Sequence, residues 1–188
     1  MDIPVSAQVE CVDGPCGHSA GMIVSPKNQQ VTHVIVKPHG DSERLVPVDK
    51  IAEASPTTIY LRCLKDELTH MDPFIEHEYV MIMPDASMWA PEPQMISMPH
   101  RRVPKGELAI ERGSRVEATD GQVGKVDELL IDPHDEHITY LVLREGHLWG
   151  QKDVTIPASQ IDHIEDDTVF LKLDKHTVES LPAVPVRK

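Results

Sequence analysis

The amino-acid sequence predicts a mainly all-β protein that consists of two small antiparallel β-barrels with short helical turns. Short runs rich in β-branched residues are joined by tight turns, and no long helical period interrupts them. One stretch also occurs twice, as VECVDGPCG at 9–17 and as VEATDGQVG at 116–124. Such a repeat predicts two copies of one folded unit.

The two copies align along most of the chain. The second copy carries extra residues around LWGQ at 148–151, and this insertion falls in a glycine-containing loop, where changes of length are tolerated. The matched pairs keep their order along the chain: Val9 with Val116, Asp13 with Asp120, Gly14 with Gly121, Gly17 with Gly124, Pro47 with Pro157 and Leu61 with Leu171.

Each copy predicts the same series of short elements. A first strand (QVECV, then RVEAT in the second copy) precedes an Asp-Gly pair, which favours a hairpin turn. A second strand (SAGMIVS; KVDELLID) leads through a polar tip to a third (VTHVIVK; ITYLVLR), which is rich in β-branched residues. A fourth strand stops at a short turn (RLVPVDKI; DVTIPASQI). The last strand (TTIYLRC; DTVFLKL) precedes one or two helical turns (KDELTHM; KHTVESL).

We expect a first barrel at 1–74, a second at 108–188, and an irregular Pro- and Met-rich linker at 75–107. Its prolines stop a helix or a central strand from persisting. One interpretation is a linker draped over the barrels. The alternative is an arm that docks a partner or is exchanged between protomers. Its adaptable apolar surface would come from Met81, Met83, Met88, Met95, Met98 and Trp89.

The composition is that of a folded, acidic protein. Hydrophobic residues make up 40% of the chain and aromatic residues 4%, and the formal net charge is −13. A field of that sign repels phosphate backbones, so we do not expect direct binding of nucleic acid. The start lacks a secretory signal pattern, and no window approaches the roughly 18–20 apolar residues that span a bilayer. With an odd count of three cysteines, these features predict a cytoplasmic protein without a disulfide framework or a membrane span.

Both copies resemble PRC-barrel domains, the family that includes the cytoplasmic domain of the photosynthetic reaction-centre H subunit and the C-terminal domain of the ribosome-maturation factor RimM. The resemblance is carried in the second copy by GSRVEATDGQVGKVDELLIDPHDEHITYLVLREG, DVTIPASQI and DTVFLKL, and in the first by the corresponding stretches. It implies a compact β-barrel adaptor without catalytic machinery that binds other macromolecules. The N-terminal membrane helix of the H subunit and the separate N-terminal barrel of RimM have no counterpart here, so neither named role transfers whole.

The glycine turns are best interpreted as structural. Gly14 and Gly121 follow Asp13 and Asp120, and glycine accepts a positive φ without a Cβ clash. Gly17 and Gly124 close the two turn motifs. A phosphate site would need a glycine-rich loop that opens a helix, whereas a strand follows here.

Metal and cofactor binding are not expected. Asp132, His134 and His137 in DPHDEHI have suitable ligand chemistry for zinc, but they fall in a polar hairpin tip that the first copy does not share. Cys11, Cys16 and Cys63 lack the base and the electropositive setting of a catalytic thiol. The candidate partner contacts are Met81, Met83, Met88, Trp89, Trp149 and, in the basic island HRRVPK, Arg101 and Arg102.

Two functions remain open at this point. The first is a non-catalytic scaffold or adaptor that binds a protein partner and self-associates, because a unit of about 70 residues rarely stabilises itself by more than about 3–5 kcal/mol. The second is a small-ligand or metal-responsive sensor, which a ligand-dependent shift in melting temperature would favour. An enzyme is not expected.

Overall fold

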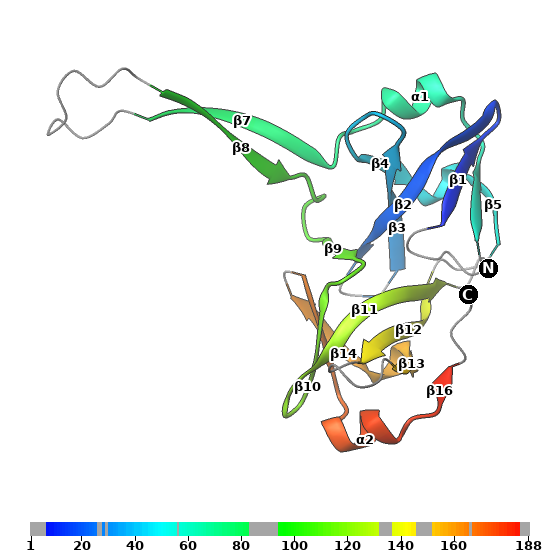
Figure 1. Cartoon of the computed structure of the whole chain (residues 1–188), viewed down its shortest axis with the longest axis vertical. Coiled ribbons are helices and arrows are strands. Elements are labelled where there is room, and N and C mark those ends of the chain that lie inside the picture. The colour runs from blue at the N-terminus through cyan, green and yellow to red at the C-terminus, as the bar shows by residue number, and fades with distance from the viewer. Residues whose placement is uncertain are drawn as a thin grey trace, which may run out of the picture.

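The computed structural model describes residues 7–25, 28, 30–55, 57–82, 94–131, 137–145, 152–165 and 167–184. Within these residues the chain forms two curled seven-stranded sheets and a separate two-stranded hairpin that points away from them (Figure 1). The mainly β, barrel-like fold class predicted from the sequence is confirmed.

The first sheet has the strand order β4-β3-β2-β1-β6-β5, and β9 pairs with β2 beside this path. Neighbouring strands are antiparallel except for β1 and β6, which run parallel. Its elements are β1 (Gln8–Cys11), β2 (Gly14–Ser25), β3 (Gln30–Pro38), β4 (Arg44–Pro47), β5 (Ile51–Ala54), β6 (Thr58–Leu61) and β9 (Leu108–Glu111), with the 3₁₀ turn η1 (Val48–Lys50) and the helix α1 (Lys65–Thr69).

The second sheet has the order β14-β15-β10-β11-β12-β13-β16, and again its one parallel pair, β10 with β15, joins the first strand of the unit to the strand that precedes its helix. Its elements are β10 (Arg115–Ala118), β11 (Gly121–Ile131), β12 (Ile138–Glu145), β13 (Lys152–Pro157), β14 (Ile161–Glu165), β15 (Thr168–Leu171) and β16 (Ala183–Val184), with η2 (Ala158–Gln160) and α2 (Lys175–Ser180).

The first hairpins of the two sheets have the same register. Val9 lies opposite Gly17 in the first sheet, and Val116 lies opposite Gly124 in the second. Each hairpin also has a β-bulge directly after that valine. A bulge increases the local twist of a strand pair, so both sheets curl from the same point.

The core is continuous across the two sheets. One cluster of buried residues includes Val24 and Val31 from the first sheet together with Leu129, Ile131 and Ile138 from the second. Of the described helices, α1 has five residues and α2 has six. No helix in the described part of the chain is long and apolar enough to span a membrane.

The other face of the first sheet carries a second buried cluster. Ile23, Ile35 and Leu45 alternate along their strands with residues of the main core, so they point to the opposite face. Phe74 and Ala109 complete this cluster. This part of the first sheet is therefore covered on both faces, which explains the apolar runs at 22–24 on β2 and 34–36 on β3.

Backbone pairing also joins the halves of the chain. Strand β9 pairs antiparallel with β2, so residues 108–111, which the sequence assigned to the second barrel, lie in the first sheet. Gly21 on β2 permits this contact, because a Cβ there would lie 2.6 Å from the carbonyl oxygen of Ile110. In addition, Gln30 forms an antiparallel bridge with His137, the residue at the equivalent position of the second half.

The expectation that the segment 75–107 is irregular is wrong for residues 75–82 and 94–101, which form strands. Strand β7 (Ile75–Ile82) pairs antiparallel with β8 (Gln94–Arg101) in a hairpin, which projects from the first sheet instead of lying over the barrels (Figure 1). Pro99 is tolerated in β8 because both strands of a two-stranded ribbon are edge strands. The prolines at 84, 91 and 93 lie outside the described residues.

Candidate interaction surface

The base of the β7–β8 hairpin is anchored in the first sheet. Phe74, directly before β7, is 1% exposed and packs in the second buried cluster. Its N–H donates to the carbonyl oxygen of Glu43 at 2.8 Å, and its own carbonyl oxygen accepts from the N–H of Arg102 at 2.6 Å. The residues that flank the two strands of the hairpin are therefore held together at Phe74, whose backbone bonds to Glu43 and Arg102 and whose side chain is buried.

Ion pairs surround this base. The guanidinium of Arg102 lies 3.3 Å from Asp72 and 3.9 Å from Glu76. Arg101 lies 3.0 Å from Glu111 on β9. Burial raises the pKa of Glu111, and the guanidinium of Arg101 opposes that rise. Arg101 and Arg102, expected as candidate partner contacts, thus both take part in ion pairs within the chain.

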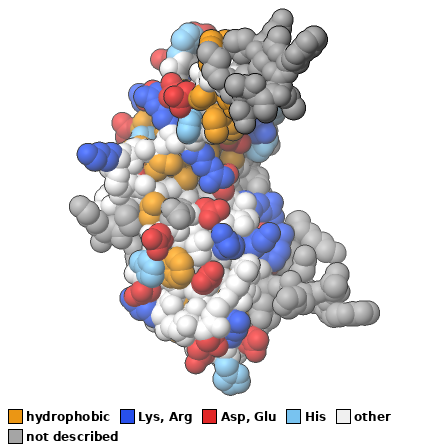
Figure 2. Space-filling view, turned by 90° about the vertical axis from the view of Figure 1, so that its left-hand side faces the viewer, with side chains coloured by type: hydrophobic (Ala, Val, Ile, Leu, Met, Phe, Trp, Pro, Cys, Tyr) orange, Lys and Arg blue, Asp and Glu red, His pale blue; other side chains and the backbone are white. Residues whose placement is uncertain are grey.

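The outer half of the hairpin exposes apolar side chains on both faces. Tyr79 is 66% exposed, and the cross-strand pair Met81 and Met95 is 57% and 65% exposed on the same face. Val80 faces Ile96 on the opposite face. Figure 2, in which the hairpin points toward the viewer, shows hydrophobic side chains gathered at the top of the molecule.

A ribbon that is apolar on both faces and projects from the body cannot be covered by that body. Isolated two-stranded hairpins are marginally stable in water, and contiguous exposed apolar surface marks interaction sites. The hairpin is therefore the candidate interaction surface. Of the other residues expected to contribute to it, Met83, Met88, Trp89 and Trp149 lie outside the described residues.

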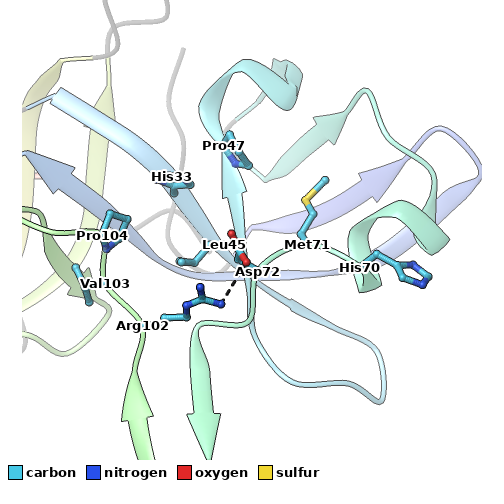
Figure 3. A pocket seen from close by; sticks show the side chains of 9 residues that line it. All are labelled: His33, Leu45, Pro47, His70, Met71, Asp72, Arg102, Val103 and Pro104. Carbon is cyan, nitrogen blue, oxygen red and sulfur yellow. Dashed lines mark hydrogen bonds and ion pairs between the residues drawn. The ribbon is translucent and has the colours of Figure 1, made fainter.

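A pocket of about 490 Å³ opens beside the hairpin base (Figure 3). His33, Leu45 and Pro47 line it from the first sheet, Met71 and Asp72 from the turn after α1, and Arg102 from the end of the hairpin. The charge of Arg102 is offset by Asp72, to which Figure 3 draws a dashed line. This pocket could not be predicted from the sequence, because its residues come from three distant segments that share no local motif.

The predicted turn residues support helices as well as turns. Gly14 and Gly121 have φ of 113° and 125°, a conformation that favours glycine. Asp13 and Asp120 lie beside the first residues of α1 and α2 and accept hydrogen bonds from the backbone N–H of Lys65 and Lys175, respectively.

Gly17 and Gly124 serve a different purpose, which is the close approach of a neighbouring strand. A Cβ at Gly17 would overlap the carbonyl oxygen of Lys37, and one at Gly124 would lie 2.5 Å from that of Arg144. Only glycine lets the strands pair at this distance.

The three cysteines lie together in the core of the first sheet as free, buried thiols. Burial raises the pKa of Cys11 to about 12 and that of Cys63 to about 11. The Cys16 thiol donates to the carbonyl oxygen of Val9 at 3.3 Å. Thiols with pKa values this high are poor nucleophiles at neutral pH.

The predicted histidine-rich tip is only partly described. Asp132 and His134 lie outside the described residues, whereas His137 is half-buried in its bridge with Gln30. Among the residues that the structure does describe, no group of three or more His, Cys, Asp or Glu side chains is placed to hold a metal ion.

Comparison with known families adds one assignment. The model of the PRC-barrel domain matches residues 112–178, which include β10 to β15 and the start of α2. No curated protein matches the chain. The second half of the chain therefore contains a PRC-barrel domain, a small β-barrel module.

Proposed function

We propose that the protein is a non-catalytic scaffold or adaptor, built from two PRC-barrel units in tandem, that binds protein partners through the β7–β8 hairpin and self-associates. The observation that carries the proposal is the hairpin itself. Its outer half exposes Tyr79, Met81 and Met95 on one face and Ile82, Ile96 and Met98 on the other. Adaptable methionine-rich surfaces of this kind suit protein contacts.

The tandem arrangement is supported by details that a chance similarity of sheets would not reproduce. The first hairpins have the same register and the same bulge. A glycine three residues beyond the turn glycine, Gly17 or Gly124, admits a neighbouring carbonyl in each half. The family match covers 112–178 only, and these shared details support our assignment of the same kind of unit to the first half.

The absence of catalysis in this proposal rests on the chemistry of the described side chains. The buried thiols have raised pKa values, and the partly buried Asp127 is engaged by Arg112 at 2.7 Å and by Arg144 at 2.8 Å. Carboxylates held in ion pairs of this kind stabilise structure rather than transfer protons. The free thiols are also compatible with the reducing cytoplasm, the location that we propose.

An affinity-capture experiment with chemical crosslinking tests the adaptor role. We expect the wild-type protein, expressed in its native cells, to crosslink to a specific partner through the hairpin. The double variant Met81→Ser/Met95→Ser should lose most of that capture, because the substitutions remove a cross-strand apolar pair.

The matched control is Val12→Ser, which removes a 70% exposed apolar side chain from the first β-turn instead. It should capture the partner as the wild type does. Equal capture by all three proteins, or crosslinks that avoid the hairpin, would contradict the proposed docking arm.

A further inference from the structure

The two edges of the hairpin differ in their capacity to accept another strand. Strand β8 carries Pro99, which has no backbone N–H, and proline is a common means of blocking an edge. Strand β7 has the sequence IEHEYVMI, without proline or glycine. Among the described strands, β7 pairs only with β8. The outer edge of β7 is therefore the edge that can extend this sheet.

The charge pattern of β7 is polarised along its length. Glu76 and Glu78 lie near the base of the hairpin, whereas Tyr79 to Ile82 form an uncharged apolar end. In an antiparallel pair of identical strands, the acidic end of each faces the apolar end of the other. Antiparallel pairing can therefore keep the like charges of the two copies from facing each other.

We infer that β7 pairs antiparallel with β7 of a second copy of this chain, around a two-fold axis at Tyr79, to form a four-stranded sheet. This inference rests on the self-association in the proposed function and specifies its surface. In this register Glu78 faces the partner's Val80, and Glu76 faces the partner's Ile82. The sheet also gains the third and fourth strands that a lone hairpin lacks.

Other registers are less favourable. An axis at Glu78 would place that carboxylate against the partner's Glu78, and an axis at His77 would place Glu76 against the partner's Glu78. Like charges directly opposite each other destabilise a strand pair. An axis at Val80 avoids this repulsion but pairs fewer residues of β7 than the axis at Tyr79.

The negative net charge of the chain favours a dimer contact that lies on the projecting hairpin, away from the two sheets of each copy. Each copy carries a formal charge of −13, so two bodies in direct contact would repel each other. The hairpin projects from the sheets (Figure 1). Antiparallel pairing of two hairpins would therefore place the two bodies at opposite ends of the shared sheet. Added salt should screen the remaining repulsion and strengthen the dimer.

Oxidative crosslinking tests the register. With copper–phenanthroline as oxidant, Tyr79→Cys should form a covalent dimer, because residues opposite each other at the axis have Cα atoms about 4.5–5.5 Å apart, within disulfide range. The matched control, Glu76→Cys, should not, because its two sulfurs would lie about 20 Å apart along the strands. The wild type, whose cysteines are buried, reports the background.

A second pair of variants tests whether β7, and not β8, forms the contact between the two copies. Tyr79→Lys places two like charges at the axis and should raise the dimer dissociation constant at least about tenfold, as measured by light scattering and sedimentation. Met95→Lys adds the same charge on the same face of β8, away from the contact, and should change the constant by less than about threefold.

The outcomes separate this inference from the proposed function. A dimer in which Tyr79→Cys fails to crosslink, or in which Met95→Lys weakens association as much as Tyr79→Lys, overturns the β7 contact and leaves self-association standing. A wild-type monomer at all concentrations overturns both. The adaptor role is judged by the capture experiment, which scores a partner other than a second copy of this chain.

Discussion

The carboxylate of Asp120 accepts a hydrogen bond from the backbone N–H of Lys175 at 2.9 Å, across 55 residues of sequence. In the first half, Asp13 accepts from the N–H of Lys65 at 3.1 Å. The first N–H groups of a helix have no partner within the helix, so a carboxylate at that end stabilises it. A turn between two strands therefore also stabilises the first residue of the closing helix of each unit.

Asp120→Ala should lower the free energy of unfolding by about 1 kcal/mol, the usual cost of removing a side chain that caps a helix. Asp120→Asn keeps an acceptor oxygen and should retain most of that stability. Urea denaturation followed by circular dichroism measures both variants. Equal losses in the two variants would show that charge, and not the hydrogen bond, is what matters at this position.

Gly124→Ala should destabilise the protein by about 1–3 kcal/mol, because the new methyl group would meet the carbonyl oxygen of Arg144 and force β11 and β12 apart. Gly17→Ala should behave alike in the first sheet. Gly40→Ala is the control, since a Cβ there has no neighbour within 4 Å and only its φ of 79° opposes the substitution, at about 1 kcal/mol. A loss at Gly124 no larger than that at Gly40 would contradict the close approach.

The cysteine core predicts a loss of stability at alkaline pH. Burial raises the pKa of Cys11 from 9.0 to about 12 in the folded protein. Above pH 9 the unfolded chain loses the thiol proton while the folded chain keeps it, so the stabilisation present below pH 9 decreases as the pH rises toward 12. Each such thiol contributes a slope of up to about 1.4 kcal/mol per pH unit.

Denaturation between pH 8 and pH 11 measures this effect. The double variant Cys11→Ala/Cys63→Ala should show a shallower decline than the wild type, because other groups titrate equally in both proteins. Parallel curves would mean that these thiols ionise as readily in the folded protein as in the unfolded chain.

Phe74→Ala should cost about 3–5 kcal/mol, as expected for emptying a buried aromatic site. Hydrogen exchange should also accelerate in β7 and β8, because both legs of the hairpin bond to the backbone of Phe74 or adjoin it. Tyr60→Ala, which removes a 41% exposed ring from the same sheet, is the control and should be nearly neutral. Unchanged exchange in the hairpin would show that its base is held elsewhere.

Local signals account for what the sequence could predict. Asp-Gly pairs at 13–14 and 120–121 fixed two hairpin turns, and alternating β-branched residues located the strands around them. The same logic failed at 75–82, because IEHEYVMI lacks the alternation that marks a strand and nearby prolines suggested irregular structure. Proline excludes a central strand, whereas this ribbon has only edges.

Long-range pairing was beyond the reach of local patterns. The run LAIE at 108–111 is four residues long, and nothing in it indicates that its partner is β2, far back in the chain. The only hint was Gly21 on β2, where the second half has Glu128. The pocket beside Arg102 depends on the same crossing of distant segments, so it became visible only in three dimensions.

Strand β9 has a mechanical consequence. The chain leaves the first sheet through the hairpin, returns to it as β9, and only then enters the second sheet. A protease site engineered between residues 82 and 94 would therefore cut the polypeptide without releasing either half. The C-terminal fragment would remain bound to the N-terminal fragment, because its strand β9 stays paired with β2 of the first sheet.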